Sequence, residues 1–352
     1  MAEQTTFPRT SPPAGKHHPG RQSGPLPTAG VSKRYWIVLG ILIVLAAGFG
    51  FGLLAWDNPM PVGTAGFWRI AELRATSIVV MAVVAICQAM ATVSFQTATN
   101  NRIITPSIMG FESLFVAVQT GAMFFFGAAG VVMMAGVPQF IVQIVIMVGL
   151  SMALYGWLLS GKYGNLQVML LVGIIIGGGL GSISVFMQRL LSPSDFDILA
   201  ARLFGSVSNA DASYLPIAIP LCLGAGILLL LNAKRLNVIA LGSDTTTSLG
   251  LNHRFEVMRV LFLVSILMAT STALVGPMTF LGFLVATLAY QLADTYDHKY
   301  VFPVAVLVGF VVLSGAYFVM KNVFYAQGVV SIIIEAVGGT VFLFFILRKG
   351  RL

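Results

Sequence analysis

Two acidic side chains stand inside otherwise apolar stretches of the sequence, where an ionisable group is costly and commonly marks a functional pathway. Glu335 lies deep in the last apolar run, and Glu112 lies near the start of the third. Amides are commoner in these runs, and Gln119 is one of them. Amides, hydroxyls and glycine suit a large polar solute that is held weakly. We take Glu112, Gln119 and Glu335 as candidate pathway residues; the alternative is that they only bond between helices.

One short motif partly matches a phosphate-binding loop, but its chemistry is incomplete. Gly156, Gly161 and Lys162 have the right spacing, whereas Tyr163 stands where a serine or threonine would bind magnesium. We find no zinc pattern, catalytic triad or dinucleotide fingerprint in the sequence, and adjacent histidines such as His17-His18 in a polar tail seldom bind metal. The sequence therefore predicts no enzyme, no metal site and no directly bound cofactor.

The elements that position these residues are predicted to be membrane helices. The chain has 352 residues, of which 57% are hydrophobic and 9% charged, whereas soluble domains carry roughly 25% charged residues. Runs of about 20 apolar residues span a hydrocarbon core of roughly 30 Å. We expect an all-α, polytopic membrane helix bundle of about ten transmembrane helices. The predicted spans are 35–56, 70–94, 107–126, 137–159, 166–190, 213–232, 257–275, 277–293, 301–320 and 327–347.

The basic residues predict how the chain is oriented. Residues 1–34 are rich in Pro, Gly, Ser and Thr and are expected to form a disordered cytoplasmic tail before a permease domain at 35–352. An even number of spans with the N-terminus inside places most of the 20 basic residues in the cytoplasm. We therefore expect a multi-pass protein of the cytoplasmic membrane with both termini inside. The net charge of +8 then reflects topology, and no nucleic-acid partner is expected.

A polar segment between two spans and a glycine cluster within one span give two further expectations. The polar segment 191–213 predicts a short external helix and loop, which could cover a pathway exit. Glycines cluster in the fifth span, and glycines four apart let helix backbones approach closely. This predicts tight packing, with a gating hinge as the alternative. The cluster is Gly173, Gly177, Gly178, Gly179 and Gly181.

The internal loop 233–256 is too apolar for a simple connector. Gly242 and Gly250 divide it, and Ser243 or Asp244 can cap its second piece. The pattern predicts two short helices that offer apolar side chains to the groove of a partner. An amphipathic helix lying on the bilayer is the alternative. The apolar side chains expected to be exposed are Leu236, Val238, Ile239, Leu241, Leu249 and Leu251.

At this loop the sequence resembles the permease subunits of the iron-siderophore and cobalamin family of ATP-binding-cassette importers. Three motifs match the family in order at 236–237, 240–242 and 248–250. The resemblance extends from about residue 35 to the end, and residues 95–119 are most similar to the branch of catecholate-siderophore permeases of the petrobactin and vibriobactin kind. Other matching residues are Gln96, Asn101, Pro106, Gly110, Gly276-Pro277, Phe280-Leu281-Gly282-Phe283, Gly328-Val329-Val330 and Gly338-Gly339.

The resemblance implies a type II importer permease that translocates a ferric siderophore while separate ATPase subunits hydrolyse ATP. It also implies a second, unlike permease or a copy of this chain, and an extracytoplasmic siderophore-binding protein, for which Arg69 and Arg74 are candidate docking residues. The implied ATPase-coupling residues are Leu236, Asn237, Ala240, Leu241, Gly242, Ser243, Asp244, Ser248, Leu249 and Gly250.

The chain also departs from the family pattern. Ala286-Thr287 and Tyr290 stand where the family usually has proline-histidine and then an arginine, and Ser77 replaces the second docking arginine. Two alternatives stay open at this point. One is haem or cobalamin as the cargo, and the other is an ion-coupled secondary transporter, which would work without an ATPase.

Overall fold

The structure, a computed structural model, describes residues 24–56, 59–61, 63–133, 135–160, 166–207, 210–324 and 330–349. Within these ranges the fold is all-α, as predicted. The helices are α1 (Ala29–Ala55), α2 (Ala65–Ala98), η1 (Ser107–Phe111), α3 (Glu112–Met133), α4 (Val137–Ser160), α5 (Leu166–Arg189), α6 (Pro193–Leu203), η3 (Ala212–Tyr214), α7 (Leu215–Leu231), α8 (Ala233–Ile239), α9 (Ser243–Ser248), α10 (His253–Val275), α11 (Leu281–Ala293), α12 (His298–Asn322) and α13 (Val330–Lys349).

The number of membrane-crossing helices agrees with the predicted bundle. In the described part of the chain, 8 helices are long and apolar enough to span a bilayer. α11 and α13 are shorter apolar helices at the positions of the remaining two predicted spans. The short helix expected within 191–213 is present as α6.

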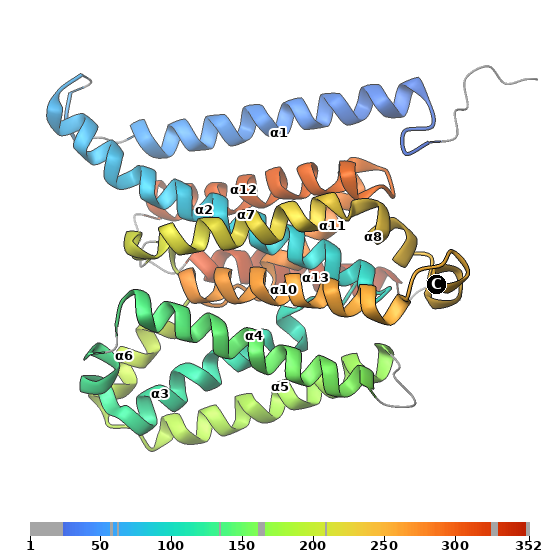
Figure 1. Cartoon of the computed structure of the whole chain (residues 1–352). Helices are drawn as coiled ribbons and strands as arrows, with labels where there is room; N and C mark the ends of the chain where they lie inside the picture. Colours follow the sequence, from blue (N-terminus) through green and yellow to red (C-terminus); the bar gives the residue numbers. More distant parts are fainter. Residues whose placement is uncertain are drawn as a thin grey trace, which may run out of the picture.

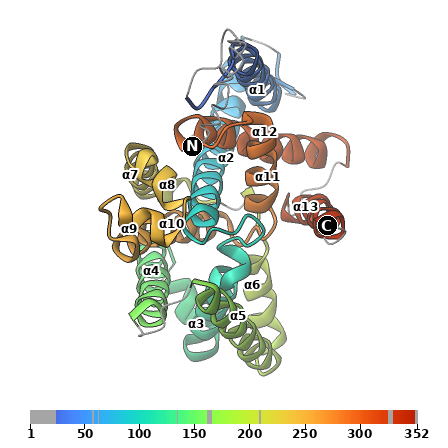
Figure 2. The same ribbon diagram turned by 90° about the vertical axis from the view of Figure 1, so that its right-hand side faces the viewer.

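The bundle is organised around α2 and α10, whose surfaces are largely buried because other helices surround them. α12 and α7 pack on α2, and α4 packs on α10. α1 lies at the periphery against α12 (Figure 1), where most of its apolar residues face outward. α3 and α5 pack together on the opposite side of α2 from α1 (Figure 2).

The two ends of the bundle carry different elements. α6 lies at one end, and α8 and α9 lie at the other (Figures 1 and 2). α1 begins at the α8–α9 end, since Arg34 Nη1 lies 3.2 Å from Asp294 Oδ2 in the turn between α11 and α12. The helix starts earlier than the predicted residue 35 because Thr28 caps it, accepting a hydrogen bond from the N–H of Val31 at 3.2 Å. Residues 1–23 of the predicted tail lie outside the described residues.

α11 begins at Leu281, later than the span predicted from 277. Its 13 residues extend for about 20 Å, which is less than the roughly 30 Å of a hydrocarbon core. The preceding chain at 276–280 is non-helical, and Met278 within it is fully buried. Irregular backbone inside a membrane protein must find internal hydrogen-bond partners.

Two breaks between helices and the start of α13 meet at this place, and we call residues 204–207, 276–280 and 330–331 the helix-break junction. The N–H of Ser206 donates to the carbonyl of Val275 at 2.8 Å, and the N–H of Ser331 donates to that of Gly205 at 3.3 Å. Gly276 has φ 88°, and a Cβ built on it would lie 3.1 Å from the Cα of Gly205. Two glycines are therefore needed for the backbones to approach this closely.

Candidate functional site

The loop 233–256 folds into the two short helices that its sequence predicts, α8 and α9. Gly242 and Gly250 follow the two helices with φ 94° and 82°, values that glycine adopts without strain. The predicted cap is wrong, since Gly242 is the N-cap residue of α9 and makes no side-chain cap. Ser243 and Asp244 are instead the first helical residues, because the turn at Gly242 already starts the helix.

Only part of the apolar loop faces outward. Leu236 and Ile239 are 0% and 1% exposed and pack into the protein's own core, so the prediction that they are offered to a partner is wrong. Leu241 and Leu249 are each 60% exposed, and Phe255 at the start of α10 is 63% exposed. We call Leu241, Leu249 and Phe255 the loop apolar patch. The other exposed coupling residues are Ala240, Ser243, Asp244, Ser248 and Gly250.

Ionic and hydrogen-bond contacts fasten α8 and α9 to the bundle. Arg235 Nη1 lies 2.7 Å from the buried carboxylate of Glu256 on α10, and Arg259 lies 3.7 Å from the same carboxylate. The buried hydroxyl of Thr246 donates to the carbonyl of Val238 on α8 at 3.1 Å. The two short helices are therefore held as one body on α10.

A partly buried network joins α8 to α12 and α2. Asn237 Nδ2 donates to Asp297 Oδ1 at 2.9 Å, and its Oδ1 accepts the backbone N–H of His298 at 3.1 Å. His298 Nδ1 is 2.5 Å from the same Asn237 oxygen, and its Nε2 is 2.6 Å from Thr97 Oγ1 on α2. With the proton on Nδ1, this nitrogen donates to Asn237 Oδ1, and Nε2 faces the Thr97 hydroxyl, which also lies 2.9 Å from the carbonyl of Val93. We call Asn237, Asp297, His298 and Thr97 the Asn237 network.

The sequence reasoning missed His298, because one histidine in a short polar connector between two predicted spans carries no spacing signal. Next to it, Tyr290 replaces an arginine of the family pattern. The guanidinium of Arg102 lies 4.2 Å from the ring centroid of Tyr290, a cation–π contact. Gln96 Nε2 holds this segment by donating to the carbonyl of Arg102 at 2.8 Å. The guanidinium of Arg102 thus lies beside position 290, where the family usually has an arginine.

One of the three candidate pathway residues, Glu112, bonds to the helix-break junction. Glu112 is largely buried at the start of α3, where its Oε1 accepts the N–H of Met278 at 3.1 Å and its Oε2 accepts the hydroxyl of Thr279 at 2.5 Å. Glu335 on α13 is partly buried. Glu112 therefore supplies the partners that the irregular backbone before α11 needs.

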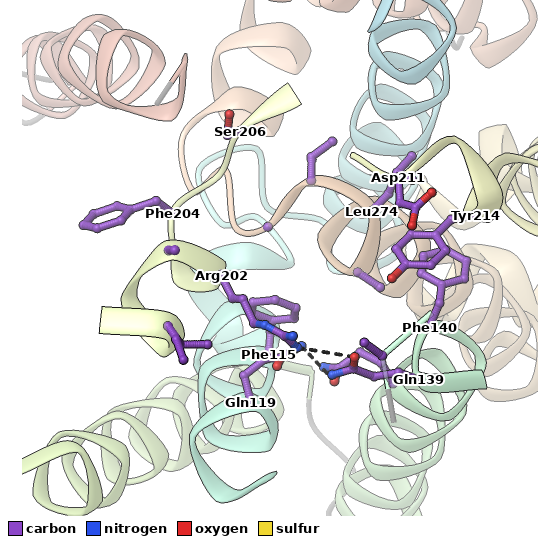
Figure 3. Close-up of a pocket in the computed structure, with 17 residues that line it drawn as sticks. Phe115, Gln119, Gln139, Phe140, Arg202, Phe204, Ser206, Asp211, Tyr214 and Leu274 are labelled. Carbon is purple, nitrogen blue, oxygen red and sulfur yellow. Dashed lines mark hydrogen bonds between the residues drawn. The ribbon is translucent and has the colours of Figure 1, made fainter. Parts of the chain in front are cut away.

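The third candidate, Gln119, lies apart from the two acids and lines a cavity of about 500 Å³ between α3, α4, α6 and α10 (Figure 3). Gln119 Nε2 donates to Gln143 Oε1 at 3.4 Å, and Arg202 Nη1 of α6 donates to Gln139 Oε1 at 3.3 Å. We call this space the α6 cavity. Its lining residues are Phe115, Gln119, Ala135, Gln139, Phe140, Gln143, Ile198, Ala201, Arg202, Phe204, Ser206, Asp211, Tyr214, Ala273, Leu274, Val275 and Gly276.

The polar segment 191–213 contributes more to this cavity than the sequence indicated. Arg202 and Asp211 both line the cavity, and the ring of Tyr214 stacks on Phe140 with centroids 4.7 Å apart. The sequence analysis took this segment only as an external helix and loop over a pathway exit. The signal that could have found this site is the combination of charged residues in the segment with glutamines at the facing ends of two spans.

The two candidate docking arginines lie at the α6 end and differ in their contacts. Arg74 Nη1 donates to the carbonyls of Trp56 at 2.7 Å and Leu54 at 3.4 Å, and so binds the C-terminal end of α1. Arg69 is exposed at the start of α2. Docking of a binding protein at these residues stays a prediction.

Several of the sequence motifs lie partly or wholly outside the residues that the structure describes. His17-His18, residues 161–163 of the incomplete phosphate-binding loop, and Gly328-Val329 lie outside the described residues. Among the residues that the structure does describe, no group of three or more His, Cys, Asp and Glu side chains could hold a metal ion.

A helix bundle with two short helices at one end and a broken-helix junction inside defines a multi-pass membrane transport permease. The sequence model of the FecCD transport family matches residues 36–348, and the chain belongs to this family. It is 52% identical to the petrobactin import system permease protein FatC of Bacillus anthracis, over 96% of this chain and 95% of that protein. It is 35% identical to the petrobactin import system permease protein YclO of Bacillus subtilis, over 90% and 97%.

A solved structure shares the fold. It is an inward-facing conformation of a metal-chelate type ABC transporter, and it matches with a TM-score of 0.76 at 20% identity. The match covers 89% of this chain and 99% of that chain. The bundle described above therefore has the same fold as that transporter chain.

Proposed function

We propose that this chain is the transmembrane permease subunit of an ATP-driven importer that translocates a ferric siderophore across the cytoplasmic membrane. The observation that carries the proposal is the 52% identity to a petrobactin import permease over 96% of the chain. Because the second relative is also named for petrobactin, ferric petrobactin or a chelate of similar donor chemistry is the proposed cargo. The chain itself binds no resident cofactor in this scheme.

ATP is hydrolysed by separate ATPase subunits that dock at the α8–α9 end. The exposed loop apolar patch, Leu241, Leu249 and Phe255, suits an apolar groove on such a partner. The Arg235–Glu256 ion pair and the Asn237 network link α8 to α10, α12 and α2. A movement of the docked ATPase would therefore move the central helices as a body.

This scheme assigns the α8–α9 end to the cytoplasm. Both the beginning of α1 and the end of α13 lie at that end (Figures 1 and 2), so both termini are proposed to be cytoplasmic. The α6 end then faces outward. There an extracytoplasmic siderophore-binding protein would dock, with Arg69 as a direct contact and Arg74 supporting the end of α1.

The pore is proposed to need a second permease. The branch that the sequence resembles works as a pair of unlike permeases, so a heterodimer is the favoured assembly and a homodimer the alternative. The outward-facing apolar side chains of α5 and α13 are available for such a contact or for lipid. They include Ile175, Phe186, Ile332, Leu343 and Phe344.

The test is uptake of radiolabelled iron as ferric petrobactin by cells with and without the gene for this chain. Uptake should be lost in the deletion strain and restored by the wild-type chain. Unchanged uptake in the deletion strain would refute the proposal. Uptake that survives loss of the ATPase but stops when the proton gradient is dissipated would indicate a secondary transporter, and selective loss of haem or cobalamin uptake would reassign the cargo.

A further inference from the structure

A narrow apolar crevice lies between α4 and α5, and we call it the α4–α5 crevice. Its volume is about 240 Å³, and η1 and the first turn of α3 complete its walls. Leu150 on its rim is 49% exposed, and Leu114, Leu154, Ile176 and Leu180 are partly exposed. The crevice is therefore open to the surroundings of the bundle along apolar side chains.

The chemistry of the walls excludes water as the filling. Of the described residues that line the crevice, only Ser151 and Tyr155 carry polar side chains, and these are 4% and 2% exposed. A buried water molecule needs roughly two to four polar partners, which these walls do not offer. An empty crevice is also unfavourable, because its lining atoms would lack contacts on one side.

The crevice opens on a surface that faces hydrocarbon. α4 and α5 are both long and apolar enough to span a bilayer. Beside the crevice, α4 exposes only large apolar side chains over the turns at Ile141, Val142, Val145 and Ile146. Figure 2 shows α4 and α13 on opposite sides of the bundle. This part of the surface therefore lies away from the face of α13 that is available to a second permease.

One face of α4 leads from the crevice to the membrane surface. Leu150, Leu154 and Trp157 follow one another at helical spacing on this face. Trp157 is 68% exposed near the end of α4 that lies toward α8 and α9 (Figure 1), and tryptophan is enriched where membrane meets water. The helix rises about 10 Å from Trp157 to Leu150. The crevice thus lies at the depth of the acyl chains.

The size of the crevice decides between the apolar bodies that could fill it. A helix with its side chains is roughly 10–12 Å across, so that one turn of about 5.4 Å occupies roughly 400 Å³ or more. This exceeds the 240 Å³ of the crevice. A single hydrocarbon chain is thin enough to enter, and the bilayer supplies such chains at this depth.

We propose that the α4–α5 crevice binds one acyl chain of a bilayer lipid from the leaflet at the α8–α9 end. The chain enters beside Trp157 and packs on Leu154 and Ile176. At its inner end it lies against Gly110, which has φ 109° and packs closely on Gly177 of α5. The bound chain therefore supports the contact between η1 and α5. The proposal concerns a lipid and stands or falls independently of the cargo.

The first test needs no variant. The full-length chain is reconstituted in liposomes that contain a trace of phospholipid with a photoactivatable diazirine midway along one acyl chain, and labelled residues are located by mass spectrometry. Leu154 and Ile176 should be labelled at least about threefold more than Val145 and Ile175, although the latter two are each 63% exposed. Labelling that simply follows exposure would overturn the proposal.

The second test fills the crevice. Ser151→Leu and Ile176→Trp each place extra apolar volume in it and should lower the labelling of Leu154 about fivefold. Ala153→Leu and Ile175→Trp add similar side chains at the neighbouring exposed positions and should change this labelling less than twofold. Equal effects of the filling variants and their neighbours would contradict a bound chain.

The third test distinguishes a lipid from a second permease. The labelling is repeated in membranes of cells that make the complete importer, where Leu154 and Ile176 should remain the preferred positions. Loss of this preference, while the isolated chain retains it, would assign the crevice to the second permease and overturn the proposal. Cells that import no ferric siderophore through this chain would refute the proposed function and leave the lipid site intact.

Discussion

Replacing Asn237 by alanine tests whether the coupling loop is fastened by its own network. The substitution removes a bond to Asp297 and strands two donors of His298, its backbone N–H and its ring Nδ1. His298 is 2% exposed, so its two donors lie away from bulk water in the intact protein. Each stranded buried group costs about 1–3 kcal/mol. Two such groups cost about 2–6 kcal/mol, and alanine regains up to about 0.7 kcal/mol of helix propensity, which leaves a net loss of about 1–5 kcal/mol.

The assay is reversible chemical unfolding of the purified chain in bicelles, with Thr247→Ala as the matched control. The Thr247 hydroxyl is exposed and bonds only within α9, to Ser243 O at 2.9 Å, so its loss should change stability by about 0.5 kcal/mol or less. Combining Asn237→Ala with Thr97→Val should cost less than the sum of the single changes, by at least about 0.5 kcal/mol, because both act on His298. Equal stability of the Asn237→Ala and Thr247→Ala proteins would refute the reasoning.

Three further substitutions test other parts of the fold. Gly177→Ala places a Cβ 2.9 Å from a backbone atom of η1 and should cost about 1–3 kcal/mol of unfolding free energy, whereas Gly178→Ala meets nothing within 4 Å and should be neutral or stabilising. Gly242→Val strains a φ of 94° without a clash and should leave membrane expression normal while ATP-driven uptake falls, an outcome that unchanged uptake would contradict. Glu112→Gln should destabilise the junction by about 1–3 kcal/mol, and Glu335→Gln should not. Comparable unfolding free energies for the two variants would argue against Glu112 as the partner of the irregular backbone.

The lengths of the spans were predictable where an apolar run coincides with a helix. α4 and α5 lie almost where the sequence places them, because charged or polar residues end each run. The start of α11 was not predictable, since residues 276–280 are as apolar as the helix that follows. The Gly276-Pro277 pair indicates a break in the chain. It does not reveal that a carboxylate from α3 completes the hydrogen bonding there.

The coupling loop shows a different limit of sequence reasoning. Its division into two helices followed from Gly242 and Gly250, which adopt positive φ angles as a break between helices requires. Which leucines face outward did not follow, because α8 has only 7 residues and two turns give no clear periodicity. Leu236 is buried and Leu241 exposed, although both are leucines in the same short segment.

The glycine cluster on α5 divides in the same way. Cβ atoms built on Gly173 and Gly177 would contact Met109 and Gly110, whereas Cβ atoms on Gly178 and Gly179 would meet nothing within 4 Å. Tight packing therefore explains the pair spaced four apart, on the face that meets η1. The other glycines lie on an open face, so packing within this chain does not account for them.

The polar residues inside the spans serve two separate purposes, and their bonding partners distinguish them. The sequence grouped Glu112, Gln119 and Glu335 as one pathway because polarity in an apolar run is the same signal in each case. Glu112 accepts a backbone N–H and a hydroxyl from a segment that lacks helical partners. Its carboxylate therefore stabilises the fold. Gln119 instead bonds to another amide whose own NH₂ group is left unpaired beside a cavity. A polar group that satisfies backbone predicts a large loss of stability on substitution, whereas an amide joined to another amide by a long bond predicts a small one.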